Sequence, residues 1–150
     1  MRVLNEQSVQ HTLHPYVHGD AVTSYGEEAS NALGISGDRI FKTLVLDVES
    51  QLVVVVVPVR EQVDLKAAAT AVGRKRAALA SQTLAERTTG YVAGGISPIG
   101  QRKQLPTVVD SSALGFQTVY VSAGRRGLQV ELSPGDLVSL TRATVADVTR

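Results

Sequence analysis

The stretch Leu52-Val53-Val54-Val55-Val56-Val57-Pro58-Val59 is dominated by valine. A strand with one face in water alternates apolar and polar side chains, whereas this run is apolar on both faces. Such a composition is typical of a central strand that is covered on both sides. The preceding segment, residues 40–48, alternates as a strand does. The two segments therefore predict neighbouring strands at the centre of a sheet.

Helices and strands are interspersed along the rest of the chain. N-cap residues and terminal glycines predict helices that begin after Ser24, Asp64, Ser81 and Ser133. Strands are predicted over residues 11–18, 105–110, 116–121, 128–132 and 144–148. With no internal repeat and no linker, this order predicts a single mixed α/β domain over residues 1–150, in which a curled, barrel-like mixed β-sheet is flanked by short helices.

The strand over residues 128–132 alternates cleanly, which predicts Gln129 and Glu131 on the solvent side. The next four residues open a helix: Ser133 is the N-cap, Pro134 takes the first helical position, and Asp136 stands where a capping box has its acidic residue. Capping alone would explain Asp136.

The composition excludes several classes of protein. The 150 residues contain no cysteine, which excludes disulfides, thiolate metal sites and a cysteine nucleophile. The formal net charge of +1 is far from that of a protein that coats nucleic acid through bulk electrostatics. No apolar run approaches the roughly 18 to 20 residues of a membrane span, and the N-terminus lacks the apolar core of a signal peptide. We therefore expect a cytoplasmic protein with neither a membrane nor DNA as a partner.

All the histidines lie in the strand predicted over residues 11–18. His11, His14 and His18 would face one way on a helix, but Pro15 disfavours a helix. On a strand, His11 points away from the other two. No metal site is expected there.

The glycine-rich stretch Gly94-Gly95-Ile96-Ser97-Pro98-Ile99-Gly100 is the first candidate for a binding site. Glycine has no side chain to keep a ligand away from the backbone, so the amides of such a loop are accessible to oxygen atoms. The spacing of its glycines imitates a P-loop, but Gln101-Arg102 follows where a nucleotide-binding loop needs Lys and then Ser or Thr. ATP and GTP are thereby excluded. The loop is either a tight structural turn or a cradle for a carbonyl or phosphate group.

Lys42 is the second candidate, because it stands on the same strand face as Ile40, Leu44 and Leu46. Its aliphatic stem can snorkel to water, which needs no function. Alternatively, its ammonium group is aimed into a pocket, where partial desolvation strengthens its attraction to a substrate oxygen.

Basic residues cluster at Arg74-Lys75-Arg76, Arg102-Lys103 and Arg125-Arg126. Such clusters are either solvated surface or contacts for a few phosphates, which would suit a protein that touches only the end of a nucleic acid. We predict that Arg125 and Arg126 bind nucleic-acid phosphates.

Several motifs occur together in a distinctive order and spacing: Phe41-Lys42-Thr43, Gly90-Tyr91-Val92-Ala93-Gly94-Gly95-Ile96-Ser97-Pro98-Ile99-Gly100, Leu105-Pro106-Thr107-Val108-Val109-Asp110, Tyr120-Val121-Ser122-Ala123-Gly124-Arg125-Arg126-Gly127 and Ser133-Pro134-Gly135-Asp136-Leu137. From about residue 12 to the C-terminus, the chain resembles the YbaK family of trans-acting aminoacyl-tRNA deacylases. That family is related to the editing domain of bacterial prolyl-tRNA synthetases, and its typical members remove cysteine from mischarged tRNA(Pro).

The resemblance implies roles for individual residues. Lys42 matches the functionally essential lysine of the family, Asp136 its acidic site residue, and Tyr16 the tyrosine that lines its pocket. The loop matches the segment whose backbone holds the aminoacyl end, which comprises Gly94, Gly95, Ile96, Ser97, Pro98 and Gly100. The resemblance also implies that no metal and no organic cofactor is needed, and that the partners are mischarged tRNA and prolyl-tRNA synthetase.

The residue inventory agrees with such chemistry. Cysteine is absent and the histidines are confined to one N-terminal strand, so no Ser-His-Asp or Cys-His nucleophile system is expected. An aminoacyl ester carries its own tethered groups, namely a ribose hydroxyl, an α-amino group or a side-chain thiol, and such tethering is worth roughly 7 to 11 kcal/mol. We expect an editing deacylase that acts on Cys-tRNA(Pro). A deacylase for alanine or other small amino acids, and a non-catalytic module that binds a tRNA end or a nucleotide, are the alternatives.

Overall fold

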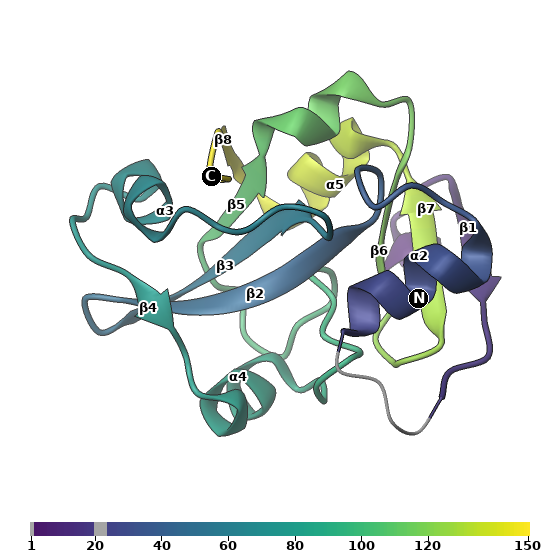
Figure 1. Ribbon diagram of the computed structural model, residues 1–150, viewed down its shortest axis with the longest axis horizontal. Helices are drawn as coiled ribbons and strands as arrows, with labels where there is room; N and C mark the ends of the chain where they lie inside the picture. Colours follow the sequence, from purple (N-terminus) through teal and green to yellow (C-terminus); the bar gives the residue numbers. More distant parts are fainter. Residues whose placement is uncertain (1, 20–23) are drawn as a thin grey trace.

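The computed structural model describes residues 2–19 and 24–150. Within these residues, short helices are interspersed with strands (Figure 1). The elements in chain order are α1 (Arg2–Glu6), β1 (His11–Pro15), α2 (Tyr25–Leu33), β2 (Phe41–Val48), β3 (Gln51–Pro58), α3 (Leu65–Ala71), β4 (Ala78–Leu79), α4 (Gln82–Thr89), β5 (Thr107–Asp110), the 3-10 helix η1 (Ser111–Gly115), β6 (Val119–Ser122), β7 (Leu128–Leu132), α5 (Pro134–Thr141) and β8 (Thr144–Ala146).

A five-stranded sheet with the strand order β4-β2-β3-β5-β8 forms the centre of the molecule. Strand β3 lies in the middle, antiparallel to β2 and parallel to β5, and its valines at positions 53–57 are fully buried. Helix α3 packs on one face of this sheet, and strands β6 and β7 pack on the other. The central, doubly covered strand that the valine run predicts is therefore confirmed.

The turn between β2 and β3 fixes the register of these two strands. Glu49 and Ser50 both have positive φ angles, of 51° and 73°, as a two-residue type I′ hairpin requires. The Asp47 carboxylate accepts a hydrogen bond from the Ser50 amide at 2.8 Å. The resulting register places Lys42 opposite Val57, near the far end of the hairpin.

A second, three-stranded antiparallel sheet has the order β1-β7-β6. It meets the larger sheet where Ile40 forms a parallel bridge to Tyr120. The mixed α/β class is thus confirmed, but the barrel-like description is corrected. The strands of the described residues form two sheets packed over a shared core and do not close into one curled sheet.

The predicted solvent side of β7 is not exposed. Gln129 is only 5% exposed, and Glu131 accepts a hydrogen bond from Thr118 and interacts with His14. This face of β6 and β7 lies under α2 and the start of β2, where Ala29, Ile40 and Tyr120 pack together (Figure 1). The alternation of β7 is as predicted, but its polar face is covered by an element from the opposite end of the chain.

The predicted helix starts are confirmed. Asp64, Ser81 and Ser133 each accept a hydrogen bond from a backbone amide three residues on. Gly34 and Gly90 end α2 and α4 in the left-handed conformation, with φ angles of 67° and 82°. In the described part of the chain, none of the helices combines the length and apolar character needed to cross a bilayer.

Candidate active site

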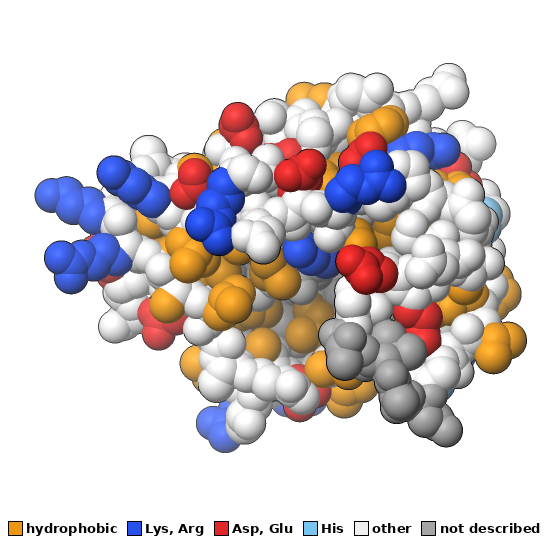
Figure 2. Space-filling model, in the orientation of Figure 1, with side chains coloured by type: hydrophobic (Ala, Val, Ile, Leu, Met, Phe, Trp, Pro, Cys, Tyr) orange, Lys and Arg blue, Asp and Glu red, His pale blue; other side chains and the backbone are white. Residues whose placement is uncertain are grey.

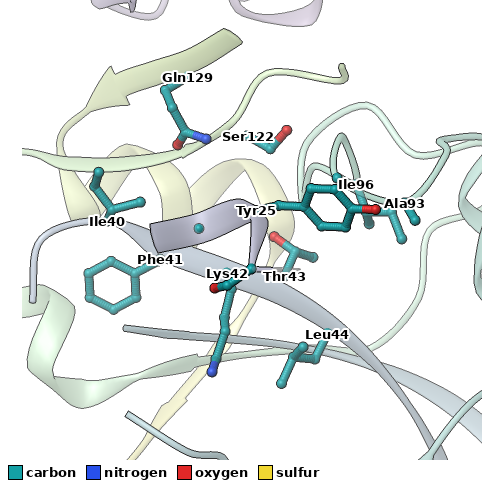
Figure 3. A pocket seen from close by; sticks show the side chains of 13 residues that line it. Tyr25, Ile40, Phe41, Lys42, Thr43, Leu44, Ala93, Ile96, Ser122 and Gln129 are labelled. Atoms are coloured by element: carbon teal, nitrogen blue, oxygen red, sulfur yellow. The ribbon is translucent and has the colours of Figure 1, made fainter. Parts of the chain in front are cut away.

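A cavity of about 260 Å³ lies beside the first half of β2. Its walls come from the start of α2, from β2, from the loop after α4, and from the adjoining ends of β6 and β7 (Figure 3). The side chains labelled in Figure 3 are those of Tyr25, Ile40, Phe41, Lys42, Thr43, Leu44, Ala93, Ile96, Ser122 and Gln129. Segments that are far apart in sequence thus meet around one space.

The cavity exists because one edge of β2 is only partly paired. Strand β4 pairs with β2 at Leu46 and Asp47, and the bridge to Tyr120 lies at Ile40. Between these two points, among the described residues, no strand pairs with this edge, and the loop after α4 faces it instead. The backbone of β2 near Thr43 therefore borders the cavity.

Lys42 is half-buried at the mouth of the cavity. Its burial lowers the pKa of the ammonium group, and the charges of Glu27 and Glu61 act in the opposite direction. In Figure 3 its side chain leaves β2 on the side away from Ser122 and Gln129. The cavity thus has a cation at one end, partly removed from water, where its field is stronger than on an open surface.

The other end of the cavity is polar. Within the described residues, the buried side-chain atoms without a hydrogen-bond partner are Thr43 Oγ1, Ser122 Oγ and Gln129 Oε1. All three residues line this cavity. Because buried polar atoms in native proteins are almost always paired, three unpaired atoms around one space indicate a wall built for a polar ligand or for water.

The glycine loop (residues 94–100) contributes backbone amides. The amides of Ala93 and Gly95 donate to Glu86 and to Val92 O, and the Ile99 amide donates to Ser97 Oγ. The amides of Gly94 and Ile96 have no acceptor among the described residues, and both residues line the cavity. These two N–H groups are available to an oxygen atom of a bound molecule.

Glycine is required in this loop by close packing. A Cβ atom at Gly95 would lie 2.5 Å from the Cα atom of Arg125. At Gly94, which has a φ angle of 86°, a Cβ atom would lie 3.0 Å from the ring of Tyr25. The loop therefore packs between the β6–β7 turn and α2 and forms one wall of the cavity.

The lining residues suggest what chemistry the cavity supports. They include the hydroxyl groups of Ser24, Tyr25, Thr43 and Ser122, but neither a histidine nor a carboxylate that could remove a proton from them. They do include a cation and free amides, which together stabilise negative charge on oxygen. Elsewhere in the described residues, no cluster of His, Asp and Glu is arranged to hold a metal ion. The arrangement suits a ligand with a carbonyl or another oxygen atom that carries negative charge.

Comparisons with known proteins identify the family of the chain. Residues 18–140 match the family described as the aminoacyl-tRNA editing domain. The chain belongs to this family. It is also 38% identical, over 99% of its length and 91% of the relative, to EbsC of Enterococcus faecalis, which is named as a candidate Cys-tRNA(Pro)/Cys-tRNA(Cys) deacylase. The resemblance predicted from the motifs is confirmed at the level of the family.

Solved structures extend the likeness to the whole fold of the editing domain. A candidate trans-editing enzyme for prolyl-tRNA synthetase superposes with a TM-score of 0.81 at 28% identity, over 93% of this chain and 87% of that one. The hypothetical protein APE2540 superposes with a TM-score of 0.87 at 29% identity, over 99% of this chain and 97% of that one.

Not all the predicted site residues of the editing domain meet at the cavity. Lys42, Gly94 and Ile96 line it, and Gly95 packs directly behind it. The remaining residues of the loop, Ser97, Pro98 and Gly100, support its shape: Ser97 and Pro98 are buried, and Gly100 adopts a φ angle of 72°.

Tyr16 and Asp136 lie outside the lining of the cavity. Tyr16 packs at the edge of the cluster formed with Ala29 and Ile40, and the aromatic ring at the cavity is that of Tyr25. Asp136 lies in the first turn of α5, after the far end of β7, where its amide donates to Ser133 Oγ. Asp136 is thus not among the residues that line the cavity, and its role in the site stays a prediction.

Arg126 contacts the wall of the cavity. Its guanidinium group lies 5.0 Å from the centre of the Tyr25 ring and forms an ion pair with Glu28 at 3.1 Å. The hydrogen bond from Arg126 also lowers the pKa of Glu28. Arg126 thus packs against Tyr25 and pairs with Glu28, whereas Arg125 is exposed. The contact of both arginines with tRNA phosphates stays a prediction.

Sequence reasoning missed Tyr25, Ser122 and Gln129 as lining residues. Ser122 and Gln129 lie on the polar positions of β6 and β7, which an alternating pattern assigns to solvent. The sequence offers one indication that these two residues line a site. They lie on either side of the turn at residues 123–127, which belongs to a motif that carries the family resemblance.

Proposed function

We propose that this protein is an aminoacyl-tRNA deacylase that removes mischarged cysteine from tRNA(Pro), and that residues 1–150 act as one editing domain. The observation that carries the proposal is the cavity itself, which combines a partly desolvated lysine, two free amides and a wall of unpaired polar atoms. The name of the relative EbsC supports the same substrate.

In the proposed complex, the ester carbonyl lies at the mouth of the cavity. The amides of Gly94 and Ile96 donate to the carbonyl oxygen as it becomes negative, and the ammonium group of Lys42 adds a fixed positive charge. Both kinds of donor are held by the fold before the substrate arrives, so little reorganisation is needed during the reaction. Thr43, Ser122 and Gln129 contact the polar groups of the amino acid.

The attacking group in this proposal is the thiol of the cysteine substrate. Its sulfur forms a bond to the carbonyl carbon, the ester bond to the ribose oxygen breaks, and the thiol proton ends on that oxygen. The products are a cyclic thioester of cysteine and free tRNA, and water then opens the thioester. A thiol with a pKa of about 8.5 is a few per cent ionised near neutral pH, whereas a serine hydroxyl is almost never ionised.

Single-turnover deacylation of Cys-, Ser- and Ala-tRNA(Pro) on one enzyme preparation tests this proposal. We expect fast release from Cys-tRNA(Pro), slow release from the other two, and a cyclic thioester as the first product. A pocket for cysteine discriminates against alanine or serine by only about 1 to 3 kcal/mol through fit, so a larger difference in rate must come from the thiol.

Two other outcomes would redirect the proposal. Comparable rates for all three substrates would exclude thiol self-attack and support a deacylase of broader specificity, which uses the ribose hydroxyl or water. Binding of tRNA without release of any amino acid would support a non-catalytic module.

The low net charge of the protein also fits a role in which prolyl-tRNA synthetase helps to bind the tRNA. With a formal net charge of +1, the protein has little bulk attraction for RNA, and prolyl-tRNA synthetase could supply most of the tRNA affinity. In this proposal the editing domain binds only the aminoacylated 3′ end.

A further inference from the structure

A second groove, of about 560 Å³, adjoins the cavity. Lys42 and Leu44 line both spaces, so the cavity and the groove meet at these two residues. A ligand with one part in each space would place the bond between the two parts next to Lys42. In an aminoacyl-tRNA, the bond between the amino acid and the terminal nucleoside is the ester.

The groove combines an apolar floor with a basic rim. Leu44, Leu65 and Leu79 contribute apolar surface, and Leu79 is 63% exposed although it is a large aliphatic residue. Lys66 and Arg150 stand at the rim. Apolar surface suits the faces of a nucleobase, and cations suit phosphates.

The charge balance of the groove favours an anion. Besides Lys42, its lining includes the cations Lys66 and Arg150 and one carboxylate, Asp64. The Asp64 carboxylate already accepts a hydrogen bond from the Ala67 amide at 3.0 Å. Among the side chains that line the groove, cations therefore outnumber carboxylates, although the charges of Glu27 and Glu61 also act on Lys42.

The guanidinium group of Arg150 is held in place at the groove. It donates to Gln62 Oε1 at 2.7 Å, and the Arg150 amide donates to the Gln62 carbonyl oxygen at 3.0 Å. A planar guanidinium fixed in this way can hydrogen-bond a phosphate or stack on a base.

Further basic side chains lie on the same end of the molecule. The loop from α3 to β4 contains Arg74, Lys75 and Arg76, all of which are exposed. Figure 2 shows Lys and Arg side chains gathered over the α3–β4 end, beside a stretch of hydrophobic surface. A strand of RNA leaving the groove toward this end would continue over positive charge.

We propose that this groove binds the 3′-terminal nucleoside of the RNA and its adjoining phosphate, with Lys66 and Arg150 as the phosphate contacts. The inference rests on the proposed function, since it assigns the RNA part of the same substrate. The aminoacyl group enters the cavity, the ester lies at Lys42, and the single-stranded end of the RNA crosses Leu79 toward residues 74–76.

Direct RNA binding tests the groove separately from catalysis. The probes are an uncharged, end-labelled RNA minihelix that ends in single-stranded CCA, and the same minihelix without this overhang. The test variant is Lys66→Glu/Arg150→Glu, and the control variant is Arg2→Glu/Arg87→Glu, which makes the same charge change at exposed residues outside the groove and outside the basic clusters. An acidic residue in the first turn of α3 is favourable to the helix dipole, so Lys66→Glu leaves the fold stable.

We expect the wild type and the control variant to bind the overhang form more tightly than the truncated form. The test variant no longer shows this preference, and the slope of log K against log salt becomes shallower by about 0.7 for each phosphate that the protein no longer neutralises. Equal binding of both minihelices by the wild type, or an equal loss of preference in the control variant, would overturn the proposal.

The same samples separate this inference from the proposed function. If the wild type deacylates Cys-tRNA(Pro) but the test variant keeps its preference for the overhang, the groove assignment fails and the deacylase stands. If the overhang preference depends on Lys66 and Arg150 but no amino acid is released, the groove stands and the deacylase fails. Binding of RNA elsewhere on the protein would leave both minihelices equivalent, which counts against the groove.

Discussion

The half-buried charge of Lys42 serves the proposed site, but it lowers the stability of the fold. Burial lowers the pKa of its ammonium group, so the folded state holds this proton less tightly than the unfolded state does. A lowered pKa on a lysine means that the protonated form opposes folding. This unfavourable contribution is fully present below the folded-state pKa, and it is relieved as the pH rises toward the unfolded value of 10.5.

Lys42→Met should therefore stabilise the protein near neutral pH while it removes the cation. Urea unfolding of the wild type and Lys42→Met at several pH values between about 7 and 10 checks this linkage. We expect the variant to be more stable at the lowest pH, and the difference to shrink as the pH rises. Lys103→Met is the control, because Lys103 is exposed. A variant less stable than the wild type at neutral pH would show that Lys42 is held by its carboxylate neighbours instead.

At the scale of elements, the glycine loop depends on its fit against the β6–β7 turn. Gly95→Ala would place a methyl group 2.5 Å from the backbone of Arg125, so either the loop or the turn must move. Overpacking of this kind typically costs about 1 to 3 kcal/mol of unfolding free energy. Because the free amides of Gly94 and Ile96 move with the loop, deacylation should fall as well.

Gly135→Ala is the matched control, because nothing lies within 4 Å of a Cβ atom there. Thermal melting and single-turnover rates of the two variants provide the comparison. Gly135→Ala should be neutral or slightly stabilising, by about 0.4 to 1 kcal/mol, with normal activity. If Gly95→Ala behaved in the same way, the loop would not be held as the structure shows.

Asp136 stabilises the start of helix α5 in this structure. Its place in the first turn of α5 favours a stabilising interaction with the helix dipole, typically worth about 0.3 to 1 kcal/mol. Asp136→Asn should therefore lower the melting temperature slightly and leave the single-turnover rate of deacylation unchanged. Loss of activity with unchanged melting would instead restore Asp136 to the site.

Over the whole molecule, the sequence predicts the helices and strands better than it predicts which residues line the cavity between them. The valine run, the helix starts and the β7 alternation follow from local rules, and the structure confirms them, although Ser24 makes no side-chain cap hydrogen bond. The alternating pattern of β7 assigns Gln129 to solvent. The sequence of this strand alone contains no sign that α2, from the other end of the chain, covers that face. The same tertiary packing brings Tyr25, and not Tyr16, to the cavity.

Some residues of the candidate site can be predicted from the sequence, and others cannot. Lys42 and the glycine loop can be predicted, because an ammonium group on an aliphatic strand face and a cluster of glycines are anomalies within their own segments. Ser122 and Thr43 are ordinary residues in sequence, and they become informative only because folding buries their hydroxyl groups without partners. Unpaired buried atoms are a property of the assembled molecule.

In the proposed function, this cavity cleaves an aminoacyl ester with Lys42 as its fixed charge. Single-turnover release of labelled cysteine from Cys-tRNA(Pro) tests it most directly, with the wild type, Lys42→Ala and the exposed control Lys103→Ala compared at a temperature where all three are folded. We expect rapid release by the wild type and the control, and a rate about 100- to 1,000-fold lower for Lys42→Ala. A Lys42→Ala variant that cleaves at nearly the wild-type rate, or a wild type that releases no cysteine, would contradict it.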